Sequence, residues 1–403
     1  MKQNKFIPEL RFPGFEGEWE EKKLREISSS YSGGTPVTTK KEFYGGSIPF
    51  IRSAEINKET TELFLTQEGL NKSSAKIVNK GNVLFALYGA NSGDVAISKI
   101  DGAINQAVLC LRTDYSNLYI YHFLTSRKDW IISKYIQGGQ GNLSGEIVKS
   151  ILIPFPSKLE QQKIADCLSS LDTLIDGHNK RLELLQEHKK GLMQQLFPQE
   201  GEKLPRLRFP EFDGEWIEKE LGNIGSFIGG GTPNTSVQEF WNGDILWYTP
   251  TEVKNGTLKE SARKISELGL KNSSAKLLPK GTILITTRAT IGDVAITQKE
   301  CTTNQGFQSL VVYSSDYNWF WYYWIKNNTD ELIRKSSGST FKEIGKHEIK
   351  SIMTFSPSKP EQQKIADCLS SLDNLIEAEE RRIEQLQLHK KGLMQKLFPV
   401  IND

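Results

Sequence analysis

Side chains that can read base edges occupy matching positions in the two halves of this 403-residue sequence. The segment FYGGSIPFIR at 43–52 aligns with FWNGDILWYT at 240–249, and ALYGAN at 86–91 aligns with ITTRAT at 285–290. Apolar positions persist between the copies, whereas Arg, Asn, Tyr and Thr change places. Side chains of these types form the hydrogen bonds that distinguish base pairs in the major groove. The candidate readers are Arg52, Tyr88, Asn91, Tyr248, Thr249, Arg288 and Thr290.

For any single one of these residues, an ordinary surface loop is an equally good interpretation. Two further polar segments, GGQGNLS at 138–144 and SSGSTF at 336–341, precede the last predicted strand of each half. They are typical of loops that approach a phosphate backbone, or of plain flexible loops. Their candidate DNA-binding residues are Gln140, Asn142, Ser339, Thr340 and the adjoining Lys342.

The pairs Asn105-Gln106 and Asn304-Gln305 recur inside otherwise apolar stretches. Amide side chains can hydrogen-bond adenine, but in such places they more often satisfy backbone groups of a loop, and we favour that role. The sequence Gly-Gly-Thr-Pro occurs at 33–36 and 230–233 and is typical of a turn. A glycine-rich phosphate cradle is the alternative, but it requires the pattern G-x-x-x-x-G-K-[ST], which the sequence lacks.

Motifs for catalysis are missing from this sequence. It has no Asn-Pro-Pro-Tyr or Asp-Pro-Pro-Tyr segment to hold a flipped adenine, and no dinucleotide-type glycine motif after a strand. The five histidines show no metal-ligand spacing, and the four cysteines lie far apart without a C-x-x-C pair. We therefore expect no catalytic residue, no metal site and no cofactor bound by this chain.

An internal repeat with a period near 200 residues organises the whole chain. EQQKIADCLSSLD stands at 160–172 and again at 361–373, and GLMQQLFP at 191–198 returns as GLMQKLFP at 392–399. The blocks 157–198 and 358–399 agree at roughly three quarters of their positions, whereas the regions before them agree only in short islands. Uniform drift after a duplication would not preserve one block and scramble the other, so the two blocks have different tasks.

Both near-duplicate blocks predict long helices. Their apolar positions alternate in steps of four and three for about five heptads, the pattern of a coiled-coil seam. Phe-Pro ends each block, because proline cannot continue a helix. The predicted seam residues are Ile164, Leu168, Leu171, Ile175, Leu182 and Leu185, and Ile365, Leu369, Leu372, Ile376, Ile383 and Leu386.

The two predicted helices should bury their seams against each other as an antiparallel pair, a rod on the order of 55 Å long. His178, Lys189, Glu379 and Lys390 interrupt the apolar seam. Polar residues within a seam often specify register, which is the interpretation we favour. A docking site for another subunit is the alternative, and the sequence does not separate the two.

The divergent blocks predict mixed α/β domains with a small sheet. Short strand-like runs are bounded by Gly, Pro and Asn, and they are followed by helical segments at 119–135 and 319–335. Of the tryptophans that enrich the second block, most are expected in its core. The predicted strands are 82–87, 94–97, 107–111, 282–287, 293–297 and 308–312.

Bulk properties narrow the class of protein. Hydrophobic residues make up 37% and charged residues 25%, which is normal for a globular protein. The sequence has no apolar run long enough to cross a membrane and no signal-peptide core at its start, so we expect a cytoplasmic protein. The net charge of +2 is low for a stand-alone DNA binder, so any DNA contacts must be clustered or shared with partners.

Two divergent domains, each followed by an EQQKIADCLSSLD…KKGLMQ-LFP helix, resemble the specificity subunit of type I restriction–modification systems. The resemblance covers essentially the whole chain. It implies two α/β target recognition domains separated by an antiparallel two-helix coiled coil. The implied division is 1–156 and 199–357 for the recognition domains, with 157–198 and 358–403 for the spacer helices.

The same resemblance implies a non-catalytic subunit that binds double-stranded DNA at a bipartite, asymmetric target with a nonspecific gap. Two methyltransferase subunits and two restriction subunits would join it, using S-adenosylmethionine, ATP and Mg²⁺ for adenine-N6 methylation and cleavage. A self-sufficient methyltransferase or nuclease is one alternative, but the four blocks leave no room for a catalytic domain. A coiled-coil scaffold without a DNA role is the other, and the divergence of the two large domains fits it poorly.

Overall fold

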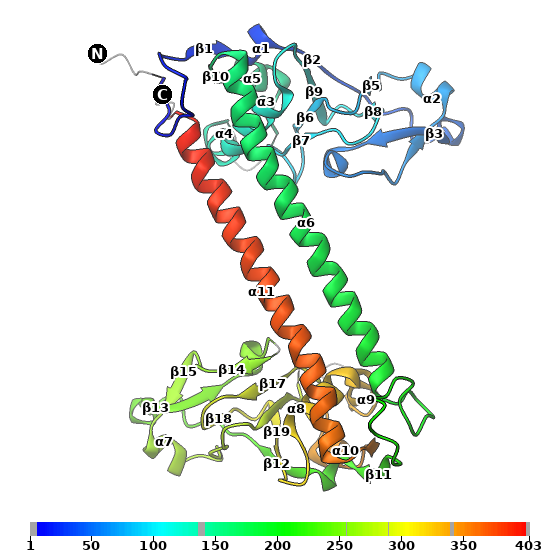
Figure 1. Ribbon diagram of the computed structural model, residues 1–403, viewed down its shortest axis with the longest axis vertical. Helices are drawn as coiled ribbons and strands as arrows, with labels where there is room; N and C mark the ends of the chain where they lie inside the picture. Colours follow the sequence, from blue (N-terminus) through cyan, green and yellow to red (C-terminus); the bar gives the residue numbers. More distant parts are fainter. Residues whose placement is uncertain (1–5, 136–141, 255, 289, 339–341, 400–403) are drawn as a thin grey trace. The chain divides into compact units, whose positions relative to one another are not determined.

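The computed structural model describes residues 6–399 except 136–141, 255, 289 and 339–341. The chain divides into two compact units, Met1–Lys180 with Glu380–Asp403, and Arg181–Glu379. Each unit is a mixed α/β domain joined to about half of each long helix, which confirms the predicted fold class (Figure 1). The four-part division predicted from the sequence stays a prediction, because the compact units divide both helices near their middle.

The described residues of the first unit form three sheets. Their strand orders are β2-β9-β6-β7, β4-β3-β8-β5 and β1-β10. Its strands are β1 Glu20–Lys23, β2 Ser29–Ser32, β3 Tyr44–Ile51, β4 Phe64–Leu65, β5 Lys76–Val78, β6 Val83–Ala86, β7 Val95–Ile97, β8 Gly102–Ile104, β9 Val108–Arg112 and β10 Leu152–Phe155. Its helices are α1 Leu24–Ile27, η1 Lys41–Phe43, η2 Ser53–Glu55, α2 Gln67–Asn71, α3 Asn117–Ser126, α4 Lys128–Tyr135, α5 Gly145–Ser150 and the first part of α6 Lys158–Leu196.

The second unit repeats this plan with strand orders β12-β19-β16-β17-β14, β15-β13-β18 and β11-β20. Its strands are β11 Ile217–Glu220, β12 Gly225–Gly229, β13 Trp241–Tyr248, β14 Thr257–Leu258, β15 Arg263–Ile265, β16 Ile283–Thr286, β17 Val294–Thr297, β18 Cys301–Thr303, β19 Phe307–Val312 and β20 Met353–Ser356. Its helices are η3 Leu221–Asn223, η4 Gln238–Phe240, η5 Pro250–Glu252, α7 Glu267–Lys271, α8 Asn318–Asn327, α9 Thr329–Arg334, α10 Lys346–Lys350 and the first part of α11 Lys359–Leu397.

All six predicted strands are present within a residue or two of the expected bounds. The helical segment expected at 119–135 is instead two helices, α3 and α4, and that at 319–335 is likewise α8 and α9. At the second break, the Asn328 side-chain amide donates to the carbonyl oxygen of Trp324 (2.8 Å), which also accepts from the Asn328 backbone amide (3.0 Å). Five of the six tryptophans of this domain are buried, as expected for most of them, and Trp319 is half-buried.

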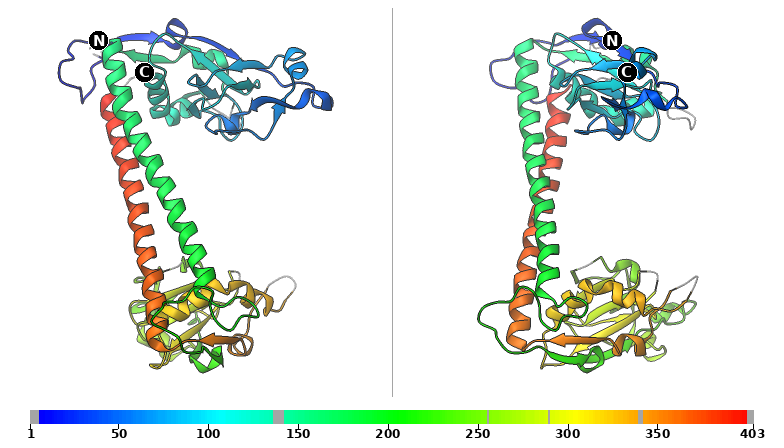
Figure 2. Two further views of the ribbon diagram at one scale, coloured as in Figure 1. Left: turned by 45° about the vertical axis from the view of Figure 1, so that its right-hand side comes forward. Right: turned by 90° about the vertical axis from the view of Figure 1, so that its right-hand side faces the viewer.

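Each domain core is completed by the last turn of the long helix that begins in the other unit. In the first unit, Met394, Leu397 and Phe398 at the end of α11 join the core that holds the start of α6. The Phe398 ring packs edge-on against two rings of α3, with centroid distances of 5.5 Å to both Tyr119 and Phe123. Both views of Figure 2 show this end of α11, in red, beside the first part of α6.

The second unit has the same construction. Met193, Leu196 and Phe197 at the end of α6 enter its core, where the Phe197 and Phe320 ring centroids lie 5.3 Å apart. Both helices end one residue before Phe-Pro, as predicted. The core of each domain therefore needs a segment that lies far away in the sequence.

The predicted seam lies on the inner side of both helices, since no residue of the set is exposed. The first two positions of each seam pack into the adjoining domain core rather than only against the other helix. Buried seam residues are Ile164, Leu168, Ile175, Ile365, Leu369, Ile383 and Leu386, and the other five are half-buried.

Two of the polar seam positions bond the opposite helix. Within the first unit, the Lys390 ammonium donates to the Asp172 carboxylate, and within the second, Lys189 donates to Asp373. Because the helices run antiparallel, a shift by one turn would separate both pairs. These pairs support register specification. Glu379, another polar position, lies 4.0 Å from the Arg181 guanidinium.

We expect Phe398→Ala to destabilise the first domain, since truncating a buried aromatic side chain typically costs about 3–5 kcal/mol. Urea unfolding followed by limited proteolysis would show earlier cleavage within residues 1–180. Leu388→Ala is the matched control, because Leu388 is 62% exposed on the same helix. Equal stability of the two variants would contradict the role of the last turn in this core.

A buried histidine gives the second prediction. His122 is fully buried, its Nε2 lies 3.0 Å from Ser169 Oγ, and its Nδ1 lies 3.9 Å from Asp172 Oδ2. Burial, together with the nearby positive charge of Lys390, lowers the pKa of His122 to about 3. The unfolded chain takes up this proton near pH 6.5 and the folded chain does not, so stability is present above that pH and falls on acidification.

The free energy of unfolding should therefore fall by about 1.4 kcal/mol per pH unit from this group between roughly pH 6 and pH 4. His122→Gln should remove that part of the slope. Denaturant titrations of both proteins across this range measure it. An identical slope in the two proteins would show that His122 does not stay neutral in the folded state.

Candidate nucleic-acid interface

The candidate readers follow the carboxyl ends of neighbouring strands. In the first unit, β3 and β8 are parallel, with Ile51 paired to Ile104. The chain therefore leaves the sheet at Arg52, beside Asn105. In the second unit, β13 and β18 are parallel, with Tyr248 paired to Thr303, and the Asn304 amide donates to the Tyr248 carbonyl (3.0 Å) beside Thr249.

Further backbone bonds bring two more segments to this place. In the first unit, Leu87 N–H donates to the Ala107 carbonyl and Leu143 N–H to the Leu87 carbonyl, both at 2.8 Å. These bonds place Tyr88 and Asn142 in the same row of loops. In the second unit, Thr287 N–H donates to Gly306 (2.9 Å) and Ile344 N–H to Thr287 (3.2 Å), which aligns Arg288 with the segment after Lys342.

We call these loops the reader edge. In the first unit it comprises residues 52–53, 87–88, 105–107 and 142–143, and in the second, residues 249–250, 287–288, 304–306 and 342–344. The folds bring together candidates that lie about 90 residues apart in each half. One edge of each domain therefore carries side chains able to bond bases and phosphates.

A glutamate, buried in the first unit and half-buried in the second, anchors the first segment of each reader edge. The Glu55 carboxylate, 2% exposed, accepts from the Arg52 guanidinium (2.9 Å) and from the Glu62 amide (3.0 Å). Burial alone would raise the pKa of Glu55, but these donors outweigh it and hold the pKa below its usual value. Glu252 takes the same place in the second unit, accepting from the amide (2.7 Å) and hydroxyl (2.8 Å) of Thr249.

Arg52 and Arg288 present cations at different points of the two edges. Arg52 also bonds Glu62 (2.6 Å), and its side chain is 37% exposed. Arg288 is 48% exposed and lies 2.8 Å from Glu343. Its counterpart in the first unit is Tyr88, which is 36% exposed. Exposed ion pairs are weak, so Arg288 can exchange Glu343 for a nucleic acid, and Arg52 can exchange Glu62 while it keeps its bond to the buried Glu55.

The remaining candidates divide into three groups. Asn142, Thr290 and Lys342 are exposed, and Asn91 is half-buried with its amide donating to Asp94 (3.1 Å). Gln140, Ser339 and Thr340 lie outside the described residues. Whether any of them contacts DNA stays a prediction.

Tyr248 does not suit the role predicted for it. The side chain is fully buried, because β13 lies between β15 and β18 and its last three residues all face other side chains. The run Ile245-Leu246-Trp247-Tyr248 carries the signal that the sequence analysis missed, since a continuous apolar run indicates a strand buried on both faces. Tyr248 is a core residue.

The Asn-Gln pairs behave partly as expected. Asn105 Oδ1 accepts from the Ala107 amide (3.0 Å) and Asn304 Oδ1 from the Gly306 amide (2.8 Å), which confirms a backbone-satisfying role for the asparagines. The glutamines instead accept from threonine hydroxyls of the Gly-Gly-Thr-Pro segments, Thr35 to Gln106 and Thr232 to Gln305, both at 2.7 Å. No pattern in the sequence indicates this pairing, because its members lie about 70 residues apart.

The Gly-Gly-Thr-Pro segments are extended loops rather than the predicted turns. A Cβ atom on Gly33 would lie 1.7 Å from the Ile104 carbonyl oxygen, and one on Gly34 would lie 1.8 Å from Ser74 Oγ. Gly230 and Gly231 are equally crowded, by Asn304 and Ser274. Close approach of neighbouring chain segments explains these glycines.

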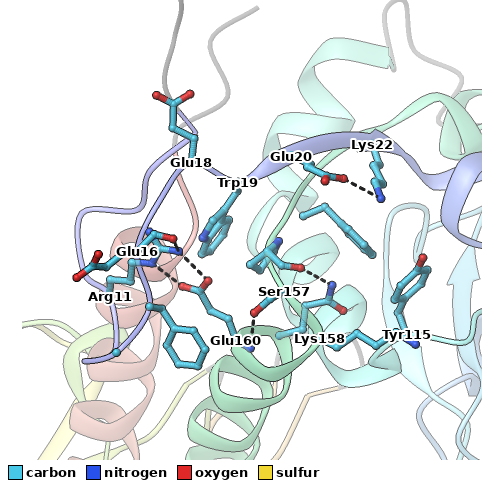
Figure 3. A pocket seen from close by; sticks show the side chains of 15 residues that line it. Arg11, Glu16, Glu18, Trp19, Glu20, Lys22, Tyr115, Ser157, Lys158 and Glu160 are labelled. Carbon is cyan, nitrogen blue, oxygen red and sulfur yellow. Dashed lines mark hydrogen bonds and ion pairs between the residues drawn. The ribbon is translucent and has the colours of Figure 1, made fainter.

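A hollow of about 530 Å³ near the start of α6 is a second place to consider (Figure 3). Arg11 forms two bonds to Glu160 (2.7 and 2.9 Å), and Lys22 lies 2.9 Å from Glu20. The charged side chains that line this hollow are thus largely paired with one another. The second unit repeats the central pair as Arg208 with Glu361 (2.7 and 2.8 Å), so we interpret it as the attachment of an N-terminal segment to a helix start.

Among the described residues, no cluster of three or more His, Cys, Asp or Glu side chains is arranged to hold a metal ion. Within the same residues, no helix combines the length and apolar character needed to span a membrane.

Comparison with known proteins agrees with the repeat. The family described as type I restriction modification DNA specificity domain matches residues 16–187 and 213–388. The type I restriction enzyme MjaIX specificity subunit of Methanocaldococcus jannaschii is 40% identical over a matched region of 178 residues. That region covers 43% of this chain and 41% of the relative's length. The putative MjaX specificity subunit of the same organism is 27% identical, over 94% of this chain and 93% of the relative.

Solved structures share the fold. The type I restriction–modification S subunit from M. genitalium aligns with a TM-score of 0.65 at 16% identity, over 98% of this chain and all of that chain. A chain from a structural study of assembly and conformational transition in the type I restriction–modification system aligns with a TM-score of 0.55 at 19% identity, over 94% of this chain and 97% of that chain. With two family domains covering most of its length, this chain belongs to the type I restriction–modification DNA specificity family.

Proposed function

We propose that this chain is the non-catalytic DNA-reading subunit of a type I restriction–modification complex, and that each domain reads one half of a bipartite, asymmetric target. The observation that carries this proposal is the reader edge. Two domains with corresponding strands, a glutamate anchor at the same place and the same Asn-Gln loop present different side chains at matching positions.

The exchanged residues have different hydrogen-bonding capacities. Arg52 is matched by Thr249 in the aligned sequences, and the equivalent backbone bonds of Leu87 and Thr287 match Tyr88 to Arg288 in the structure. Arginine donates in a bidentate fork, which suits guanine, whereas threonine offers one hydroxyl and a methyl group that can contact thymine. A common frame with different donors and acceptors supports recognition of two unlike half-sequences.

The long helices have a separate task in this proposal. Each is continuous over 39 residues, and we propose that the antiparallel pair sets the nonspecific gap and supplies docking surface. Among the described residues, five leucines of these helices are exposed and belong to neither domain core: Leu159, Leu174, Leu184, Leu375 and Leu388. We propose that they contribute to the surface on which a partner protein docks.

The partners of this proposal are two methyltransferase subunits and, in the full complex, two restriction subunits. The methyl donor S-adenosylmethionine, together with ATP and Mg²⁺, would be bound by those subunits for adenine-N6 methylation and DNA cleavage. The low net charge of +2 is consistent with DNA contacts that are shared across such an assembly.

Mapping N6-methyladenine genome-wide in cells with and without this chain tests the proposal. Methylation should appear at one interrupted, asymmetric motif only when the chain is present. Replacing residues 1–156 by the recognition domain of another specificity subunit should change one half of that motif and leave the other half intact. Unaltered methylation without the chain, or a change in both halves after the exchange, would refute it.

Arg288→Ala should relax base preference at one position in one half of the motif. A bidentate contact contributes about 1–3 kcal/mol of discrimination, roughly a ten- to hundredfold change in the affinity ratio. Competition binding with duplexes that vary each base pair measures this ratio. Arg334→Ala is the control, because Arg334 is an exposed, ion-paired arginine on α9 of the same domain. Loss of affinity for all duplexes alike would place Arg288 on a phosphate instead.

A further inference from the structure

One pair of exposed polar residues is identical at the two reader edges. The Thr35 hydroxyl donates to Gln106 Oε1 and the Thr232 hydroxyl to Gln305 Oε1, with the same 2.7 Å distance. All four side chains are exposed. Gln106 lies in the loop segment between Arg52 and Tyr88, and Gln305 in the segment between Thr249 and Arg288. The neighbours on both sides differ between the domains, whereas this pair does not.

In each domain, the loop that carries the threonine and the loop that carries the glutamine are held in place by close packing and by hydrogen bonds. The glycines before each threonine leave no room for a side chain between Ile104 and Ser74, or between Asn304 and Ser274. Asn105 and Asn304 fix the loops that carry the glutamines through bonds to the backbone two residues later. The position of the glutamine amide relative to each sheet is therefore set before any ligand arrives.

The orientation of each amide determines what it can bind. Because the oxygen already accepts from threonine, the two N–H groups of Nε2 are left as donors that none of the described contacts engages. Adenine recognition by glutamine uses the amide oxygen and nitrogen together. A phosphate oxygen requires donors alone, and side-chain amides are common partners of the DNA backbone.

From these observations we propose that Gln106 and Gln305, each oriented by its threonine, bind DNA phosphate groups and position each reader edge on the duplex independently of sequence. The inference rests on the proposed function. An identical exposed group does not distinguish two unlike half-sequences, whereas every nucleotide offers the same phosphate. The neighbouring residues that differ between the domains then contact bases from a fixed position on the duplex.

The test replaces the free donors without breaking the threonine bond. In Gln106→Glu and Gln305→Glu, a carboxylate still accepts from the threonine hydroxyl but repels a phosphate. Gln67→Glu is the matched control, since Gln67 is exposed on α2 of the first domain and donates to Asn71. The full chain is used, assembled with its methyltransferase partner, on the mapped target duplex and on a duplex of equal length without the target.

Each glutamate variant should bind both duplexes about tenfold or more weakly, since a hydrogen bond to a charged group is lost. The double variant should be weaker still, and the methylated motif and the thermal unfolding temperature should not change. In Gln106→Ala the dependence of affinity on salt should stay as in the parent, because an uncharged amide releases no counterions.

Three results would overturn this inference and leave the proposed function standing. Variants that bind as tightly as Gln67→Glu would show that the glutamines only tie two loops together. A weakening confined to one base identity would make them base readers, and a lowered unfolding temperature with unaltered binding would make the pair structural. A parent complex that shows no preference for the target duplex would instead refute the proposed function, and this inference with it.

Discussion

Both domains depend on apolar side chains supplied by a helix that starts elsewhere in the sequence. Phe398 completes the core around Tyr119 and Phe123, and Phe197 does so around Phe320. Burying a phenylalanine is worth a few kcal/mol, a large part of the net stability of an ordinary domain. Neither recognition domain is therefore a contiguous folding unit, and the helix ends cannot vary as freely as the surface loops.

The polar residues between the two long helices have a different effect from these apolar side chains. Lys189 and Lys390 are nearly buried, with side chains 9% and 12% exposed, and each reaches an aspartate of the opposite helix. A pair of this kind adds little net stability, because desolvation offsets much of the attraction. A slipped register would leave a buried ammonium without a carboxylate, which costs far more. The pairs thus select one alignment among several that the apolar seam alone would allow.

The sequence predicted the elements whose pattern is long and regular. The heptad steps identified both helices and their inner faces, and Phe-Pro marked their ends, because these signals are local and repeat many times. It did not predict the division of α3 from α4 or the pairing of Thr35 with Gln106. Such features depend on side-chain bonds between particular residues, and a single sequence records neither their partners nor their direction.

Tyr248 shows how the candidate site was partly misjudged. Its alignment with Ile51 placed a tyrosine where the other half has an aliphatic residue, and a change of residue type was read as a change of specificity. In the structure both positions lie inside their strands and both side chains are buried. The next residue, Arg52 or Thr249, is the first one outside the sheet. Residues that differ between the domains inside the strands therefore change packing, whereas residues that differ just beyond the strand ends can change recognition.

This division suggests how the two domains came to differ without losing their shared fold. Glu55 and Glu252 occupy corresponding positions, the first buried and the second half-buried, and each bonds the backbone of the residue that follows the strand. The anchor holds the main chain whatever side chain that residue carries, so a guanidinium or a hydroxyl can occupy the same point of the reader edge. Because the glutamate satisfies backbone donors, its loss would leave those donors unpaired and destabilise the loop. Recognition can therefore change at the residue after the strand only while the glutamate that anchors it stays.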